Sequence, residues 1–198
     1  MAYDKFTVLR SSAVPLPLEN VDTDQIIPAR FLKATKREGF GDNLFRDWRY
    51  NADNNPKQDF ILNNAIYSGK ILVAGRNFGS GSSREHAAWA IYDYGFRCVV
   101  SSFFADIFKG NSLNIGILPV TVSPEFLDKI FLAIEADPNA ELEINLPEQT
   151  ITLVASGEQE SFAINGYKKH NMINGFDDID YLQAMKSEIK TFAEASLY

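Results

Sequence analysis

Residues 70–101 read KILVAGRNFGSGSSREHAAWAIYDYGFRCVVS. Lys70–Ala74 predicts a short buried strand, and Phe96–Ser101 predicts the next one. A glycine-rich loop over Gly75–Gly81 and a helix over Ser82–Tyr94 lie between them. A strand–loop–helix–strand crossover favours parallel pairing of the two strands. The sequence therefore predicts an α/β fold with a parallel core.

The segments on either side extend this core. Upstream, Phe6–Val14 predicts a strand that ends at Pro15 and Pro17. Downstream, Ser123-Pro124 predicts the start of a helix that runs to about Ala136, with serine as N-cap and proline in the first turn. We expect short strands over residues 141–146, 149–155 and 161–164, of which the last two form an antiparallel hairpin around Ser156-Gly157.

The C-terminal part predicts a long amphipathic helix at about residues 178–196. Leu182, Met185, Ile189 and Phe192 recur there at helical spacing with charged residues between them. We expect residues 1–198 to form a single domain, with antiparallel strands added to the parallel core.

Composition excludes several classes of protein. The chain has 198 residues, 45% of them hydrophobic, which excludes a fully disordered chain. A net charge of −7 argues against nucleic-acid binding, which needs clustered Lys and Arg. A single cysteine, Cys98, and two histidines exclude a disulfide framework and a self-contained iron–sulfur cluster, and predict no metal site. No secretory signal and no membrane-spanning run is visible, so we expect a cytoplasmic protein without membrane contact.

The loop from Gly75 to Gly81 predicts an anion site. Its glycines let the backbone approach a ligand, and the amides at the start of the following helix point towards a bound anion. An alternative is purely structural, because Ser82 and Glu85 have the spacing of a capping box. The loop lacks the Gly-Lys-Ser/Thr ending of a phosphate-binding Walker loop and the third glycine of a dinucleotide-binding fingerprint.

A second cluster, Asn20-Val-Asp-Thr-Asp-Gln-Ile-Ile-Pro28, contains two carboxylates spaced by one residue. Such residues usually bond to the local backbone and hold a turn, so we interpret Asp22 and Asp24 as structural. His86, in the second turn of the predicted helix, is interpreted as a supporting residue at most.

Together these motifs resemble the small subunits of 3-isopropylmalate dehydratase. The resemblance rests on residues 21–28 (VDTDQIIP) and 79–87 (GSGSSREHA), with further matches at residues 39–49, 102–108 and 171–178. It covers nearly the whole chain.

The resemblance implies a fold, a reaction and a partner. The fold would be the swivelling β/β/α domain found at the C-terminus of aconitase. The reaction would convert 2-isopropylmalate to 3-isopropylmalate through 2-isopropylmaleate, in leucine biosynthesis. The chain would act only as a heterodimer with a large subunit, which would carry a [4Fe–4S] cluster, so this chain would hold no cofactor itself.

The resemblance also implies roles for site residues. Ser82 would be the catalytic base, and Ser83 and Arg84 would bind a carboxylate of the small dicarboxylate substrate. Arg37 best fits a further substrate-binding arginine, with Arg30 and Lys33 left as alternatives. Structural or supporting roles would fall to Asp22, Thr23, Asp24, Gly79, Gly81, Glu85 and His86.

Three other functions stay open at this point. A related hydro-lyase, homoaconitase or citraconate/methylmalate dehydratase, would share the serine–arginine chemistry. A regulatory RNA-binding protein is disfavoured by the net charge of −7. A stand-alone anion-binding module would need no iron–sulfur partner.

Overall fold

The computed structural model describes residues 3–33 and 35–195. Within these residues, seven strands form one mixed sheet in the order β4-β3-β2-β1-β5-β6-β7. The strands are β1 (Val8–Leu16), β2 (Ile71–Ala74), β3 (Cys98–Ser101), β4 (Leu118–Thr121), β5 (Glu141–Asn145), β6 (Thr150–Leu153) and β7 (Glu158–Ser161).

Strand β1 joins a parallel half of the sheet to an antiparallel half. It pairs in parallel with β2, which continues in parallel to β3 and β4. On its other side β1 pairs antiparallel with β5, followed by β6 and β7. The predicted parallel core and the added antiparallel strands are both confirmed.

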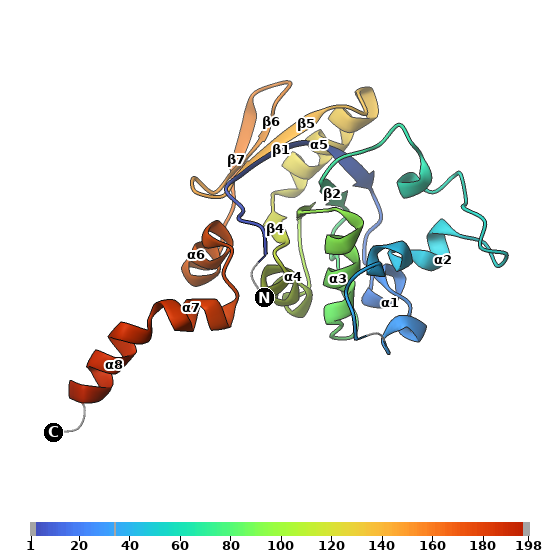
Figure 1. Cartoon of the computed structure of the whole chain (residues 1–198). Helices are drawn as coiled ribbons and strands as arrows, with labels where there is room; N and C mark the ends of the chain where they lie inside the picture. Colours follow the sequence, from blue (N-terminus) through green and yellow to red (C-terminus); the bar gives the residue numbers. More distant parts are fainter. Residues whose placement is uncertain (1–2, 34, 196–198) are drawn as a thin grey trace.

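Helices cover both faces of the parallel half (Figure 1). The α-helices are α1 (Thr23–Ile26), α2 (Arg46–Arg49), α3 (Glu85–Tyr94), α4 (Asp106–Ile115), α5 (Pro124–Ala136), α6 (Gly166–Asn174), α7 (Asp178–Ala184) and α8 (Lys186–Ala195). Short 3₁₀ turns are η1 (Ala29–Phe31), η2 (Phe40–Asn43) and η3 (Ile61–Asn63).

The core is divided by the sheet. Leu72 of β2 packs in one cluster with Ile91 of α3, whereas its neighbour Val73 packs in the other cluster with Ile130 of α5. Successive residues of a strand face opposite sides, so a strand covered on both faces is apolar throughout. This explains why all four positions of β2 are buried.

One strand boundary differs from the prediction. Strand β1 continues through Pro15, which lies opposite Val73 of β2. The prediction that Pro15 ends the strand is therefore wrong. On the other side of β1, strand β5 pairs only with Val8–Ser12. The missing N–H of Pro15 therefore falls where β5 no longer lies alongside, which is where a strand tolerates proline.

The C-terminal segment also differs from the prediction. Helices α7 and α8 meet at Met185, so the continuous helix expected at residues 178–196 is interrupted within the described part, and residue 196 lies outside it. Both helices run away from the sheet (Figure 1). None of the described helices is long and apolar enough to cross a membrane.

Candidate functional site

Two loops meet where β1 and β2 end. These strands are parallel neighbours, so the segments that follow them leave the sheet at the same edge. The backbone amide of Gly79 donates to the carbonyl of Val21 at 2.8 Å, and the amide of Thr23 donates to Ser80 at 2.9 Å. The Asp22–Asp24 cluster and the glycine-rich loop therefore form one unit.

Helix α1 presents this cluster to the loop. The Asp22 carboxylate accepts from the amide of Gln25 at 2.8 Å, and the Gln25 side chain accepts from the amide of Asp22 at 2.9 Å. This reciprocal capping box fixes the single turn of α1. The next two side chains, Thr23 and Asp24, are thereby held beside the residues that precede α3.

Helix α3 begins later than its sequence predicts. Its first residue is Glu85, and the N-cap position belongs to Arg84, whose backbone is extended at φ −130° and ψ 101°. The prediction that the helix begins at Ser82 is wrong, and the alternative of a Ser82–Glu85 capping box is not found. Gly81 lies in the left-handed region at φ +87°, which prolongs the loop past Ser82.

Ser82 is consequently not occupied by helix capping. The buried Thr23 hydroxyl donates to the backbone carbonyl of Ser82 at 2.9 Å, and the two hydroxyl oxygens lie 3.5 Å apart. Ser82 and the adjacent Ser83 are both exposed. Their hydroxyls are held at an open surface, on a backbone that Thr23 fixes.

Arg84 forms a two-pronged ion pair with Asp24. One terminal nitrogen donates to Asp24 Oδ2 at 2.8 Å, and the other contacts Oδ1. The second nitrogen also reaches the carbonyl of Ile27 at 3.4 Å. Hydrogen bonding from Arg84 holds the pKa of the Asp24 carboxyl below its usual value. A planar guanidinium matched to a carboxylate is the geometry by which arginine recognises carboxylates.

Gly79 is required by close packing. A Cβ atom there would lie 2.2 Å from Cγ of the buried Phe108, and φ is +78°. Gly81 has more room, since its nearest neighbour would be Cβ of Asp22 at 3.4 Å.

The side chain of Arg37 packs against helix α3, where its neighbours differ from those of Arg84. Its guanidinium sits 4.9 Å from the Trp89 ring centroid and 3.4 Å from Glu85, whose carboxylate also accepts from Trp89 Nε1 at 3.0 Å. The ring of His86 packs 4.4 Å from that of Trp89. The structure thus links Arg37 to α3 at Glu85, the residue after Arg84, and gives it no contact with Ser82.

The two alternatives to Arg37 are placed differently. Arg30 is paired with Asp47 through both terminal nitrogens, which ties it to α2. Lys33 is exposed.

A further link between the two loops involves Asn77, a residue without a predicted role. Its side-chain amide donates to Asn20 Oδ1 at 2.8 Å. Both residues lie in the left-handed region, at φ +62° and +56°. Asparagine is enriched at such positions, which is the signal that could have identified the pair.

Comparison with known proteins gives a family. The Aconitase C-terminal domain family matches residues 3–125, and the LeuD_N family matches residues 128–166. The chain is 61% identical over 195 residues to the 3-isopropylmalate dehydratase small subunit of Cytophaga hutchinsonii, covering 98% of this chain and 97% of the relative. It is 62% identical over 191 residues to that of Christiangramia forsetii, covering 96% and 93%. This chain belongs to the family of 3-isopropylmalate dehydratase small subunits.

A solved member of this family shares the fold. The crystal structure of 3-isopropylmalate dehydratase from Methanocaldococcus jannaschii superposes with a TM-score of 0.69 at 25% identity, covering 93% of this chain and 98% of that one. The α/β swivelling-domain fold expected from the resemblance is confirmed.

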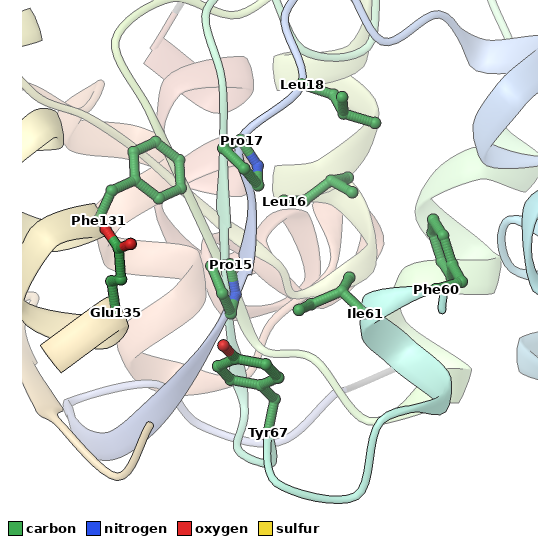
Figure 2. A pocket seen from close by; sticks show the side chains of 9 residues that line it. All are labelled: Pro15, Leu16, Pro17, Leu18, Phe60, Ile61, Tyr67, Phe131 and Glu135. Carbon is green, nitrogen blue, oxygen red and sulfur yellow. The ribbon is translucent and has the colours of Figure 1, made fainter. Parts of the chain in front are cut away.

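A hollow of about 460 Å³ lies elsewhere on this small subunit (Figure 2). It is lined by the end of β1, by η3, by Tyr67 and by one side of α5. Its wall is mostly apolar and includes neither Ser82 nor Arg84. We therefore place the candidate site at the two loops, where the polar and charged groups converge.

The residues of this small subunit do not fit an iron–sulfur cluster. Cys98, its only cysteine, is fully buried in β3, and burial raises the pKa of its thiol far above the usual value. Within residues 3–33 and 35–195, no three His, Cys, Asp or Glu side chains converge as metal ligands. A cluster bound by thiolates would need cysteines from another chain.

Proposed function

We propose that this chain is the small subunit of 3-isopropylmalate dehydratase in the cytoplasm and works as a heterodimer with a large subunit. The complex would isomerise 2-isopropylmalate to 3-isopropylmalate through 2-isopropylmaleate, in leucine biosynthesis. The observation that carries the proposal is the union of the Asp22–Asp24 and Ser82–Arg84 motifs at one sheet edge, in a chain about 60% identical to small subunits of that name.

The reaction requires a base on one side of the substrate. A proton leaves the carbon next to a carboxylate, and hydroxide leaves the neighbouring carbon, so that a double bond forms. Ser82 is the proposed base for the proton. Its alkoxide would be too basic to form alone, and the start of α3 and the positive charge of Arg84 would stabilise it. An exposed Ser82 free of helix capping supports this role.

The substrate's carboxylates require hydrogen-bond donors. We assign one carboxylate to Arg84 and the adjacent Ser83, because a guanidinium binds a carboxylate through two parallel hydrogen bonds. Arg37 stays the proposed second arginine. In this chain its guanidinium stacks on Trp89, and we propose that it reaches the substrate only in the complete enzyme.

The other half of the site would come from the large subunit, including a [4Fe–4S] cluster. The burial of Cys98 supports this division of labour. Every step assigned to this chain is therefore a proton or carboxylate step.

Reconstitution tests the proposal. We expect the isolated chain to bind no iron and to show no turnover of 2-isopropylmalate, and turnover to appear when the reconstituted large subunit is added. Iron content and product formation would be measured on the same preparations. Stoichiometric iron in the isolated chain would contradict the proposed division.

Substrate choice separates this function from its relatives. The same complex would be offered homoaconitate and citraconate at equal concentration. A kcat/KM for either that exceeds the value for 2-isopropylmalate would assign the chain to a related hydro-lyase.

A further inference from the structure

The contact between Asp24 and Arg84 conflicts with the task proposed for Arg84. Both terminal nitrogens of the guanidinium already face a carboxylate that belongs to this chain. A substrate carboxylate that seeks the same two nitrogens must compete with it. The conflict rests on the proposed function only in taking Arg84 as the substrate's partner.

Asp24 is the outer member of the pair. The side chain of Arg84 is 13% exposed, whereas that of Asp24 is 58% exposed. A ligand that arrives from outside therefore meets Asp24 before it meets the guanidinium. Because Asp24 is more than half exposed, solvent weakens its pairing with Arg84, so a competing anion can break the pair.

Asp24 also has a second neighbour. Its carboxylate lies near the backbone of Ala29, the first residue of η1, which helps to lower the pKa of Asp24. Residues 29–37 are the segment that carries the candidate side chains Arg30, Lys33 and Arg37. One carboxylate thus pairs with Arg84 and lies near the start of this segment.

We propose that Asp24 is a positioning residue that occupies Arg84 in the empty site and is displaced by a carboxylate of the substrate. In the empty site it holds the guanidinium in its two-pronged orientation and balances its charge. When the substrate binds, Asp24 turns away from Arg84 and stays near the backbone of Ala29. The side chain can do this without moving α1, because the capping box uses Asp22 and Gln25.

The strength of the Asp24–Arg84 pair determines how much dicarboxylate affinity should change when Asp24 loses its charge. An exposed ion pair stabilises its partners by a few tenths to about 1 kcal/mol, which corresponds to a roughly two- to five-fold competition against an incoming carboxylate. Removing the charge of Asp24 should therefore tighten dicarboxylate binding by that factor.

The first experiment uses the full chain alone with succinate as the probe. Succinate affinity would be measured by NMR titration for the native chain, for Asp24→Asn and for Asp24→Glu. We expect two- to five-fold tighter binding for Asp24→Asn and near-native binding for Asp24→Glu, which keeps the charge. The gain should vanish in Asp24→Asn/Arg84→Gln, since it acts through the guanidinium.

A matched control is available in Glu141→Gln. Glu141 of β5 forms an exposed pair with Arg10 of the neighbouring strand β1 at 2.7 Å and 2.8 Å, and neither residue belongs to the two loops. This variant removes one carboxylate from an arginine elsewhere, so succinate affinity should stay native.

The second experiment uses the complex with the large subunit. We expect Asp24→Asn to lower KM for 2-isopropylmalate two- to five-fold while kcat stays within about two-fold. Loss of turnover by the native complex would refute the proposed function and leave the succinate result standing. Unchanged or weaker succinate binding by a folded Asp24→Asn chain, checked by its melting temperature, would overturn the displacement of Asp24 whatever the complex does.

Discussion

Ser82 lies three residues before the start of α3, although its spacing from Glu85 is that of a capping box. Its structural tie is instead the hydrogen bond that its backbone carbonyl receives from Thr23. That hydrogen bond uses the backbone of Ser82 and not its hydroxyl. The stability of the fold and the chemistry of the site can therefore be separated at this one side chain.

Replacing Ser82 by alanine should leave stability nearly unchanged. We expect a change in the free energy of unfolding within about 0.5 kcal/mol, as for a surface residue that caps nothing. Turnover of the reconstituted complex should fall by roughly 10²–10⁴-fold, the contribution of a positioned general base. Urea denaturation and product formation would be measured on the same variant.

Ser123→Ala is the matched control, because Ser123 is a true N-cap. Its hydroxyl accepts from the amide of Phe126 at 3.2 Å and donates to Glu160 at 2.7 Å. Here we expect a loss of about 1 kcal/mol in stability with turnover retained. If Ser82→Ala keeps most of its turnover once complex formation is confirmed, Ser83 becomes the next candidate for the base.

At the scale of elements, the loop between β2 and α3 is held by packing as much as by hydrogen bonds. Gly79 is buried against Phe108 of α4, whose ring is also 5.2 Å from that of Phe78 in the same loop. The loop that carries Ser82 thus depends on a helix that holds none of the proposed site residues.

Gly79→Ala should destabilise the protein by about 2–5 kcal/mol. The left-handed backbone disfavours a Cβ atom, and that atom would also overlap Phe108. Gly157→Ala separates the two effects, since Gly157 has φ +74° with nothing within 4 Å of the added carbon. We expect it to cost only about 1–2 kcal/mol.

The clash can be tested directly by trimming the neighbour. Phe108→Ala removes the Cγ and Cδ1 atoms that the new methyl group would overlap, so combining it with Gly79→Ala should cost less than the sum of the two single losses, whereas independent losses would simply add. Additive losses in urea denaturation would contradict the packing explanation.

Elements with strong local signals could be predicted from the sequence. The apolar runs of β2 and β3 and the Ser123-Pro124 start of α5 are found where the residues place them. The start of α3 could not be, because the hydrogen bond that holds the Ser82 backbone comes from Thr23, in a loop some 60 residues away. The Asp24–Arg84 ion pair could not be predicted for the same reason. Its two residues lie 60 positions apart, and spacing along the chain does not indicate which arginine pairs with a given carboxylate.

At the scale of the whole molecule, two amphipathic helices differ in whether their apolar face is buried. Helix α5 buries Phe126, Leu127, Ile130 and Ile134 against the sheet. Helix α8 buries none of its described side chains, and Phe192 is 74% exposed. Helical spacing of apolar residues predicts that a face is available for packing, and the position of the element decides whether this chain covers it.

This contrast yields a matched pair of substitutions. Ile130→Ala should lower the free energy of unfolding by about 2–5 kcal/mol, because it opens a cavity in the core. Ile189→Ala, the same chemical change on α8, should alter it by no more than about 0.5 kcal/mol, because Ile189 is 48% exposed. Phe192→Ala should behave like Ile189→Ala despite removing a larger side chain. Urea denaturation of the isolated chain checks all three, and a loss at Ile189 or Phe192 comparable to that at Ile130 would mean that α8 packs onto the body of the protein in solution.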